Sequence, residues 1–300
     1  MKENTHLYFA EKVFDCLENK NLRKILKENF DYYVLGSVFP DIFYHNKKTS
    51  EISQIIHGRE LEKTNELIFD FLNYAKEKQD EKSLAFTLGY ISHYVLDSKL
   101  HPIVYFLTGN YYDKDQTKRF SAMLYHRQLE TLWDKKLTKG FSLCKKVKIS
   151  SLNDLSLTNI IFEKYEINKK TFISIFKQCK INNRLFRSYM TYLLFIFLIK
   201  VGLYKNKTVD GFFLFTKNKN LENISNDLSY RDLITGEHKK ENLLDLMKKT
   251  ELYSKDLLES AYEYYLGKIS ILELERTIPG VSLDTGKIDF SVESIVYTKY

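Results

Sequence analysis

Residues 88–102 read LGYISHYVLDSKLHP, and this stretch decides the fold class. From about residue 84 to residue 100, apolar residues recur at the spacing of an α-helix, with His93 and Asp97 set among them. Pro102 is predicted to end or bend this helix, because proline lacks the backbone donor and clashes with the preceding turn. A polar group in an apolar setting needs a partner, so the stretch predicts a buried helix that carries a polar site.

Histidine–carboxylate pairs recur in the chain at a spacing of one helical turn. His93 and Asp97 form one pair, and His126 and Glu130 form another on a separate predicted helix. Side chains at i and i+4 lie on one face of a helix, and zinc accepts imidazole nitrogen and carboxylate oxygen at about 2.0–2.2 Å. A single such pair is usually a weak surface ion pair, but two of them favour a shared metal site. The sequence adds two further candidate ligands: His57 and His101.

The rest of the chain predicts an all-α fold in a single compact multi-helix domain over residues 1–300. Glycine and proline, which strands and tight turns favour, occur only 11 and 3 times, whereas 22 Tyr and 21 Phe suggest an aromatic core. The candidate metal site falls within residues 1–135, and helices within 170–300 are predicted to complete the core. Helical periodicity covers these approximate ranges: 8–17, 52–75, 84–100, 121–137, 170–179, 185–203, 243–266 and a short piece near Leu272.

Other segments have less regular patterns. Residues 36–50, GSVFPDIFYHNKKTS, are predicted to form a loop, and residues 141–168 and 208–237 to hold long connections. The longest apolar run, residues 192–199, stops at Lys200. This run is too short to span a bilayer and predicts a buried helix.

Charge and cysteine content narrow the class of protein. The formal net charge of +7 comes from 46 basic and 39 acidic residues in mixed stretches, which is typical of a solvated helical surface, so no stable nucleic-acid partner is expected. The three cysteines, Cys16, Cys144 and Cys179, form no C-x-x-C pair, which excludes a cysteine zinc knuckle. The first 20 residues carry charges throughout and lack the apolar segment of a signal peptide. A cytoplasmic protein without a transmembrane segment is expected.

Taken in order, these motifs resemble the zinc-dependent phospholipase C family, and in particular its cytoplasmic, signal-less relatives. Five motifs are similar to that family's signature: THLYFAEKV at 5–13, GSVFPDIF at 36–43, the isolated pair His57-Gly58, the 88–102 stretch and HRQLE at 126–130. ITGEHKKENLLDLMKK at 234–249 is similar to its closing segment, so the resemblance covers nearly the whole chain. It implies an all-helical fold shared with the helical trinuclear-zinc nucleases.

The resemblance also implies a ligand set of two or three Zn²⁺ ions. One zinc would be held by His57, His93 and Asp97, and a second by His101, His126 and Glu130. His6 would contribute to a third, which Asp97 would bridge to the first. Asp41, in the Pro40-Asp41 turn, would bind or deprotonate the attacking water.

The activity that the resemblance implies is phosphodiester hydrolysis, with phospholipid as the implied substrate. A metal-bound hydroxide, oriented by Asp41 as base, would attack phosphorus in line, because metals lower the pKa of bound water from 15.7 towards about 7. A zinc-dependent nuclease or small-molecule phosphodiesterase on the same fold is an alternative. A non-enzymatic helical protein with structural zinc is another.

Two features differ from the secreted members of that family. Those members complete the third zinc site with the amine and carbonyl of an N-terminal tryptophan, whereas this chain starts with Met1, five residues before His6. The secreted choline-lipid enzyme has aromatic residues where Ile42 and Gln54 stand here. The resemblance therefore does not extend to choline-headgroup recognition. Three polar residues outside the ligand set are interpreted as surface groups: His45 and His238 as exposed histidines and Arg127 as part of an exposed ion pair.

Overall fold

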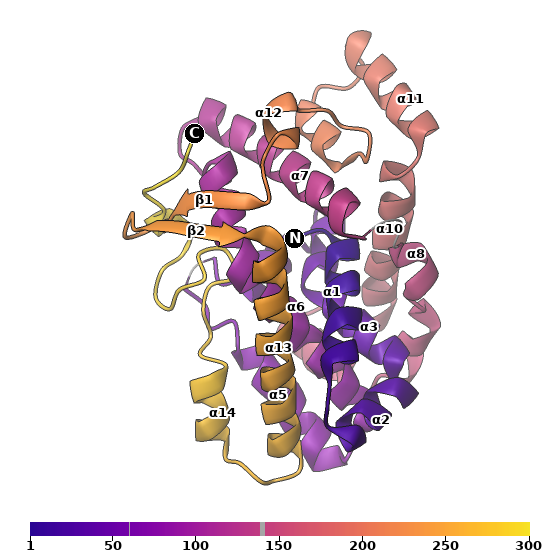
Figure 1. Cartoon of the computed structure of the whole chain (residues 1–300). Helices are drawn as coiled ribbons and strands as arrows, with labels where there is room; N and C mark the ends of the chain where they lie inside the picture. Colours follow the sequence, from indigo (N-terminus) through magenta and orange to yellow (C-terminus); the bar gives the residue numbers. More distant parts are fainter. Residues whose placement is uncertain (60, 139–141) are drawn as a thin grey trace.

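The computed structural model describes residues 1–59, 61–138 and 142–300, and it confirms the all-α prediction (Figure 1). The α-helices are α1 (Glu3–Cys16), α2 (Lys20–Glu28), α3 (Phe30–Val38), α4 (Ser50–Ile56), α5 (Glu66–Lys78), α6 (Glu81–Thr108), α7 (Gln116–Thr138), α8 (Leu143–Lys146), α9 (Thr158–Lys164), α10 (Lys169–Phe186), α11 (Tyr189–Lys200), α12 (Lys219–Glu222), α13 (Leu243–Tyr265) and α14 (Ile271–Thr277). The 3-10 helices are η1 (Phe39–His45), η2 (Ile149–Asp154), η3 (Lys207–Phe212) and η4 (Val292–Ser294), and the strands are β1 (Asp227–Arg231) and β2 (His238–Asn242).

Helix α6 is the central element of the fold, and α1, α3, α5, α7 and α13 pack around it. Its first turn is capped by Asp80, whose carboxylate accepts the backbone N–H groups of Lys82 and Ser83. Its residues are buried on all faces over most of its 28-residue length. A helix with this burial is stabilised by packing from every side, which explains why it can carry polar side chains at fixed positions.

The prediction that Pro102 could end the helix is wrong. The proline lies inside α6, which continues to Thr108 before Gly109. An interior proline costs a helix about 3 kcal/mol, since a hydrogen bond is lost and the ring clashes with the preceding turn. Burial of the apolar residues on both sides, such as Leu100, Ile103 and Val104, offsets that cost.

The single long helix predicted over residues 52–75 is two helices in the structure. Helix α4 ends at Ile56 with His57 as its C-terminal cap, and α5 begins only at Glu66. Gly58 follows with φ +77°, a left-handed conformation that ends a helix and that glycine adopts without strain. The helix therefore stops where it leaves the His57 side chain free to point away from it.

The segment 36–50 and the connection after residue 208 also hold more structure than predicted. Residues 39–45 form η1, a 3-10 helix that carries Asp41. Strands β1 and β2 form an antiparallel hairpin in which Asp227 pairs with Asn242 and Arg231 with His238. The predicted connection 141–168 holds α8, η2 and α9, and its first residue lies outside the described residues.

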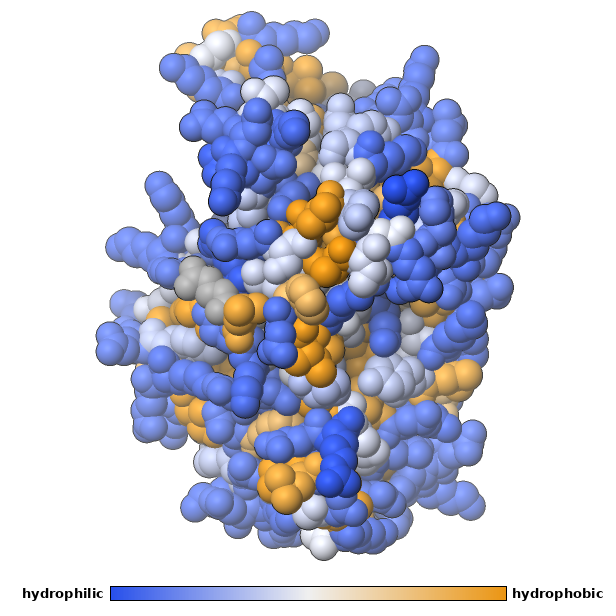
Figure 2. All heavy atoms as spheres, turned by 90° about the vertical axis from the view of Figure 1, so that its left-hand side faces the viewer, coloured by the Kyte–Doolittle hydropathy of each residue, from blue (hydrophilic) through white to orange (hydrophobic). Residues whose placement is uncertain are grey.

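The apolar run that predicted a buried helix forms α11, but that prediction is wrong about burial. Phe195 is the one residue of α11 that is buried. In Figure 1 the helix lies at the upper right, beyond the end of α10. On the face shown in Figure 2, by contrast, hydrophilic side chains cover most of the surface and hydrophobic ones form smaller patches.

One hydrophobic core cluster joins the two ends of the chain. It contains buried residues from Met1 to Leu283, including α1, α3, α6, α10 and α13. We propose on this basis that residues 1–300 form one domain, in which the later helices complete the core around α6. In the described part of the chain, no helix is both long and apolar enough to cross a membrane.

Two glycines allow α3 and α6 to approach each other closely. A Cβ atom added at Gly89 of α6 would lie 2.0 Å from the carbonyl oxygen of Tyr33, and one added at Gly36 of α3 would lie 1.8 Å from that of Phe86. Both clashes are with backbone atoms, which cannot rotate away. The close contact fixes η1, which follows α3, relative to the polar side chains of α6.

We expect Gly89→Ala to lower the free energy of unfolding by roughly 3 kcal/mol or more, because the two helices would have to separate. Chemical denaturation followed by circular dichroism measures this. Gly202→Ala is the matched control: its added methyl meets no atom within 4 Å, and its positive φ of +74° leaves only a backbone cost of about 1 kcal/mol. Equal losses for the two variants would contradict the close-packing argument.

Candidate metal centre

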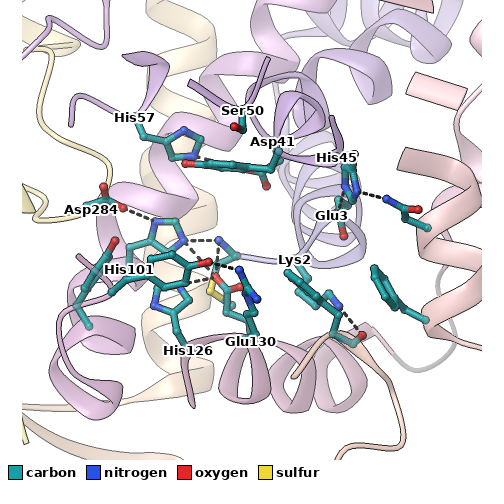
Figure 3. Close-up of a pocket in the computed structure, with 18 of the residues that line it drawn as sticks. Lys2, Glu3, Asp41, His45, Ser50, His57, His101, His126, Glu130 and Asp284 are labelled. Carbon is teal, nitrogen blue, oxygen red and sulfur yellow. Dashed lines mark hydrogen bonds and ion pairs between the residues drawn. The ribbon is translucent and has the colours of Figure 1, made fainter. Parts of the chain in front are cut away.

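The predicted site residues come from five elements: Asp41, His57, His101, His126 and Glu130 line one pocket (Figure 3), and His6, His93 and Asp97 are buried behind them. Helix α6 contributes three of them at intervals of one turn, and the others come from α1, η1, the end of α4, and α7. In Figure 3, His57 and Asp41 lie on one side of the pocket, and the other side holds the group of His101, His126 and Glu130. The structure thus brings together all eight predicted residues: His6, Asp41, His57, His93, Asp97, His101, His126 and Glu130.

The first group of potential ligands surrounds the carboxylate of Asp97. His6, Asp41, His93 and Asp97 offer ligand atoms that all lie within 4.8 Å of one another. His57 adjoins this group, with Nε2 at 3.3 Å from Asp41 Oδ1 and 3.5 Å from Asp97 Oδ2. The geometry therefore associates His6 as closely as His57 with the predicted pair of His93 and Asp97.

The second group consists of His101, His126 and Glu130. Their ligand atoms also lie within 4.8 Å of one another, and Nε2 of each histidine is 3.3 Å from Glu130 Oε1. Behind His101, Nδ1 lies 3.6 Å from the carboxylate of Asp284, in the C-terminal tail. The pairing of His126 with Glu130 across one turn of α7 matches the spacing seen in the sequence.

Asp97 contacts both groups: its Oδ2 faces the first group, and its Oδ1 lies between the first and the second. Its Oδ2 lies 3.1 Å from Nε2 of His93, while its Oδ1 lies 3.3 Å from Nε2 of His6 and 3.7 Å from Nε2 of His101. The α-amine of Met1 is 2.8 Å from the same Oδ1 and 2.6 Å from Nε2 of His101. A carboxylate in this position can bridge two cations.

Two of the imidazoles are fixed by backbone carbonyls behind them. Nδ1 of His57 lies 2.6 Å from the carbonyl oxygen of Ser53, and Nδ1 of His93 lies 3.0 Å from that of Ser37. Because a carbonyl oxygen only accepts, each Nδ1 must carry the proton and donate it. In the neutral form of each ring, Nε2 then faces the carboxylates with a free lone pair, which is the arrangement of metal-binding histidines.

The hydrogen bonding of these side chains is incomplete without a further ligand. Buried polar atoms are nearly always paired, yet several here make no hydrogen bond. These are both ring nitrogens of His6, Nε2 of His57 and His93, Oδ2 of Asp97, and Nδ1 of His101 and His126. Most of these unpaired atoms are imidazole nitrogens beside carboxylates, which is the donor set that zinc prefers, so the residues fit a zinc site.

The charges in the pocket also suit bound cations. Burial opposes ionisation of Asp97, but His101, the Met1 amine and His6 hold its pKa well below its usual range. Burial likewise opposes ionisation of Asp41, and the neighbouring His93 and His57 hold its pKa low. Both carboxylates are therefore anionic at neutral pH and attract positive charge.

The histidines of the first group differ in their protonation. Burial and the neighbouring His6 lower the pKa of His93 to about 4, so this ring is neutral at pH 7. It stacks on His6 with ring centroids 3.8 Å apart, a contact that two protonated rings would disfavour. Burial opposes protonation of His57, but the carboxylates of Asp41 and Asp97, 3.3 and 3.5 Å from its Nε2, raise its pKa to about 10. A metal ion at this Nε2 would replace the proton between the imidazole and the two carboxylates.

The pocket itself is a cavity of about 380 Å³ lined by polar and aromatic side chains. Asp41 and Glu130 reach its surface, whereas the side chain of Asp97 is 0% exposed. The aromatic residues around it are Tyr44, Tyr105, Tyr111, Tyr112, Phe186 and Phe212. Sequence analysis missed these, because they come from separate segments and no local pattern marks them as neighbours.

Two polar residues of the pocket had been interpreted as surface groups, and the structure corrects both. Arg127 is not in an exposed ion pair: it donates to Thr208 Oγ1 at 2.7 Å and to the Tyr111 hydroxyl, and its guanidinium lies 4.4 Å from the Phe212 ring centroid. His45 is only 13% exposed and lies 2.7 Å from Glu3. The interpretation of His238 as a surface histidine is confirmed.

His45 belongs to a third group of potential ligands, together with Glu3 and Cys179. Here, however, the polar atoms have partners: His45 Nε2 contacts Glu3, and its Nδ1 accepts from the Asn182 amide at 3.0 Å. This group is satisfied by its own hydrogen bonds, unlike the two groups around Asp97 and Glu130. A metal ion is not needed there.

Comparison with known proteins gives one finding about the whole arrangement. The family model described as zinc dependent phospholipase C matches residues 5–204, a range that contains all eight predicted site residues. No curated protein and no solved structure matches the chain.

We expect the purified protein to contain about two or three zinc ions per chain, and Asp97→Asn to lose more than one of them because its carboxylate contacts histidines of both groups. Elemental mass spectrometry measures the content. His126→Gln should lose about one ion and leave the Asp97 group loaded, and His238→Gln, on the surface, should lose none. Full zinc content in Asp97→Asn would exclude the bridging role.

Proposed function

The chain belongs to the zinc-dependent phospholipase C family, and from this premise we propose that it is a zinc-dependent phosphoric diester hydrolase that acts on phospholipid. The observation that supports this proposal is the convergence of unpaired buried imidazole nitrogens and anionic carboxylates at the wall of an open pocket. A structural zinc site is closed by four ligands, whereas catalytic sites keep a position accessible to substrate. The two groups lie beside a cavity, which favours catalysis.

The proposed metal ligands are His57, His93, Asp97 and His6 in the first group, and His101, His126 and Glu130 in the second. Zinc at such a site lowers the pKa of bound water and stabilises the negative charge that develops on phosphoryl oxygens. The carbonyls of Ser53 and Ser37 hold the rings of His57 and His93 in the tautomer that presents Nε2. Asp97, shielded from solvent, holds the two groups at a fixed separation.

Asp41 is the proposed general base. Its carboxylate is anionic, it reaches the pocket, and it lies at 3.3 Å from His57 Nε2 and 3.5 Å from His6 Nε2. It sits on η1, which Ser53 of α4 fixes by donating its hydroxyl to the Pro40 carbonyl at 2.5 Å. A carboxylate held beside the ligands can orient a water molecule and accept its proton as it attacks phosphorus.

The opposite side of the pocket suits the rest of an anionic phosphodiester. Lys2 and Arg127 line it with positive charge, and Phe186 and Phe212 with apolar surface. Ile42 and Gln54 do not take part, because Ile42 is fully buried and Gln54 is bonded to Arg59. Tyr44 of η1 lines the pocket instead, with its ring 5.7 Å from that of His57. Headgroup contacts would therefore come from other aromatic residues than in choline-specific enzymes.

We expect Asp41→Asn to lower kcat by about 10²–10⁴-fold while zinc content is kept, because the amide cannot accept the proton. The assay is hydrolysis of a chromogenic phosphodiester together with zinc analysis of the same sample. Asp256→Asn, an exposed aspartate on α13, is the matched control and should behave as wild type. Loss of zinc in Asp41→Asn would make Asp41 a ligand instead of the base, and full activity would remove it from the mechanism.

We expect the protein to hydrolyse phospholipid and a chromogenic diester, to leave single-stranded DNA intact, and to lose activity with a chelator while it keeps its helical circular dichroism. The helical core does not depend on the site for most of its burial, which is why the fold should survive zinc removal. Cleavage of DNA in preference to lipid would favour the nuclease alternative. Unfolding on chelation with no hydrolysis of any diester would favour structural zinc.

A further inference from the structure

Helix α11 presents an apolar stripe to solvent. Met190, Leu193, Leu194, Phe197 and Val201 recur at intervals of three and four residues and therefore share one face of the helix. Of these side chains, Met190 is 73% exposed, Phe197 57% and Leu194 56%. Soluble proteins seldom expose contiguous apolar patches of this kind unless the patch binds something.

The opposite face of α11 is anchored to the wall of the pocket. The ring of Phe195 lies 5.0 Å from that of Phe213, and the ring of Tyr192 lies 5.4 Å from it. Phe213 in turn packs 5.2 Å from Phe186, which lines the pocket and stacks on Phe212. One aromatic cluster thus joins the exposed helix to the aromatic side of the proposed catalytic pocket.

The chain around α11 is strongly basic. Residues 177–219 contain nine lysines and arginines and a single acidic residue, Asp210, although the whole chain has a net charge of only +7. The basic residues are Lys177, Lys180, Arg184, Arg187, Lys200, Lys205, Lys207, Lys217 and Lys219. An apolar helix face in a basic setting is the pattern of helices that lie in the headgroup region of an anionic bilayer.

We propose that α11 and the basic residues of 177–219 form a docking surface for an anionic phospholipid bilayer. The apolar stripe enters the headgroup region, and the aromatic cluster places the pocket beside the membrane surface. Lys180 is bonded to the Val147 carbonyl and Arg187 is paired with Asp134, so the lipid phosphates are contacted by the exposed basic residues of the segment: Lys177, Arg184, Lys200, Lys205, Lys207, Lys217 and Lys219. If the protein is the proposed phospholipid hydrolase, docking allows it to take its substrate directly from the bilayer, and this consequence rests on the proposed function. Bilayer binding itself does not require hydrolysis.

Other occupants fit the surface less well. With 12 residues, α11 is too short to cross a bilayer, so it would lie at the surface. A second copy of the chain would bring two basic segments face to face in a symmetric dimer, and like charges oppose such an interface. An anionic surface satisfies both the apolar stripe and the charge.

The test measures co-sedimentation of the zinc-loaded protein with vesicles. We expect binding to equimolar phosphatidylglycerol–phosphatidylcholine vesicles, weaker binding to pure phosphatidylcholine, and release by salt, because screening weakens contacts with lipid phosphates. The double variant Met190→Ser/Phe197→Ser and the charge variant Lys200→Glu/Lys205→Glu should each bind at least about tenfold more weakly. Leu272→Ser/Val296→Ser, which alters two equally exposed apolar side chains outside α11, is the matched control and should bind as wild type.

Activity on a water-soluble diester separates this proposal from the proposed function. Both α11 variants should keep wild-type hydrolysis of the soluble diester and lose hydrolysis of vesicle phospholipid, whereas a general folding defect would lower both. Wild-type protein that cleaves the soluble diester but does not bind anionic vesicles would overturn the docking surface and leave the hydrolase intact. Vesicle binding without any diester hydrolysis would support the docking surface and overturn the proposed hydrolase function. A dimer in light scattering that Phe197→Ser dissociates, with no vesicle binding, would assign α11 to self-association instead.

Discussion

The arrangement of the candidate metal centre depends on one buried carboxylate. The side chain of Asp97 lies at the centre of the molecule with no solvent exposure, and ring nitrogens of His6, His57, His93 and His101 face its two oxygens. A desolvated carboxylate is costly unless positive charge or hydrogen-bond donors surround it. The chain meets this requirement by bringing segments that are distant in sequence to one turn of α6. The burial of the Asp97 carboxylate thus explains why the histidines gather around it.

Backbone contacts position the elements around Asp97. The two glycines between α3 and α6 bring the helices so close that η1 and α6 have one possible separation. Ser37, near the end of α3, then supplies the carbonyl that orients His93, while Ser53 of α4 both orients His57 and holds the turn that carries Asp41. The tail closes the arrangement when Leu283 donates its backbone N–H to the His57 carbonyl at 3.0 Å. The rings of His57 and His93 are therefore oriented by main-chain carbonyls.

The sequence predicted the parts of this site that are local in the chain. The spacing of His93, Asp97 and His101 on an apolar helix is a property of α6 alone, and the structure agrees with it. Other contacts join distant segments, which periodicity cannot show. These are the bonds of the histidine rings to backbone carbonyls, of Arg127 to Tyr111, and of His45 to Glu3. The prediction for α11 failed for a different reason. An apolar run predicts a buried helix only if other segments of the same protein pack against it. Pro102 and the β1–β2 hairpin show the same limit, since tertiary packing overrode the local preference of the chain.

The distribution of charge connects these features. The floor of the pocket is anionic, with Asp41 and Glu130 at its surface and Asp97 buried behind them, all held ionised. An anionic phosphodiester would be repelled from this floor without bound cations. The opposite wall and the segment 177–219 beyond it are basic. An anionic lipid would thus be attracted first at the rim, where salt-sensitive charge–charge attraction acts over about 10 Å. At the floor it would be held only by metal ions bound to the carboxylates. For the proposed lipid substrate, the separation of the two charges would set a direction of approach, from the surface of α11 towards Asp41.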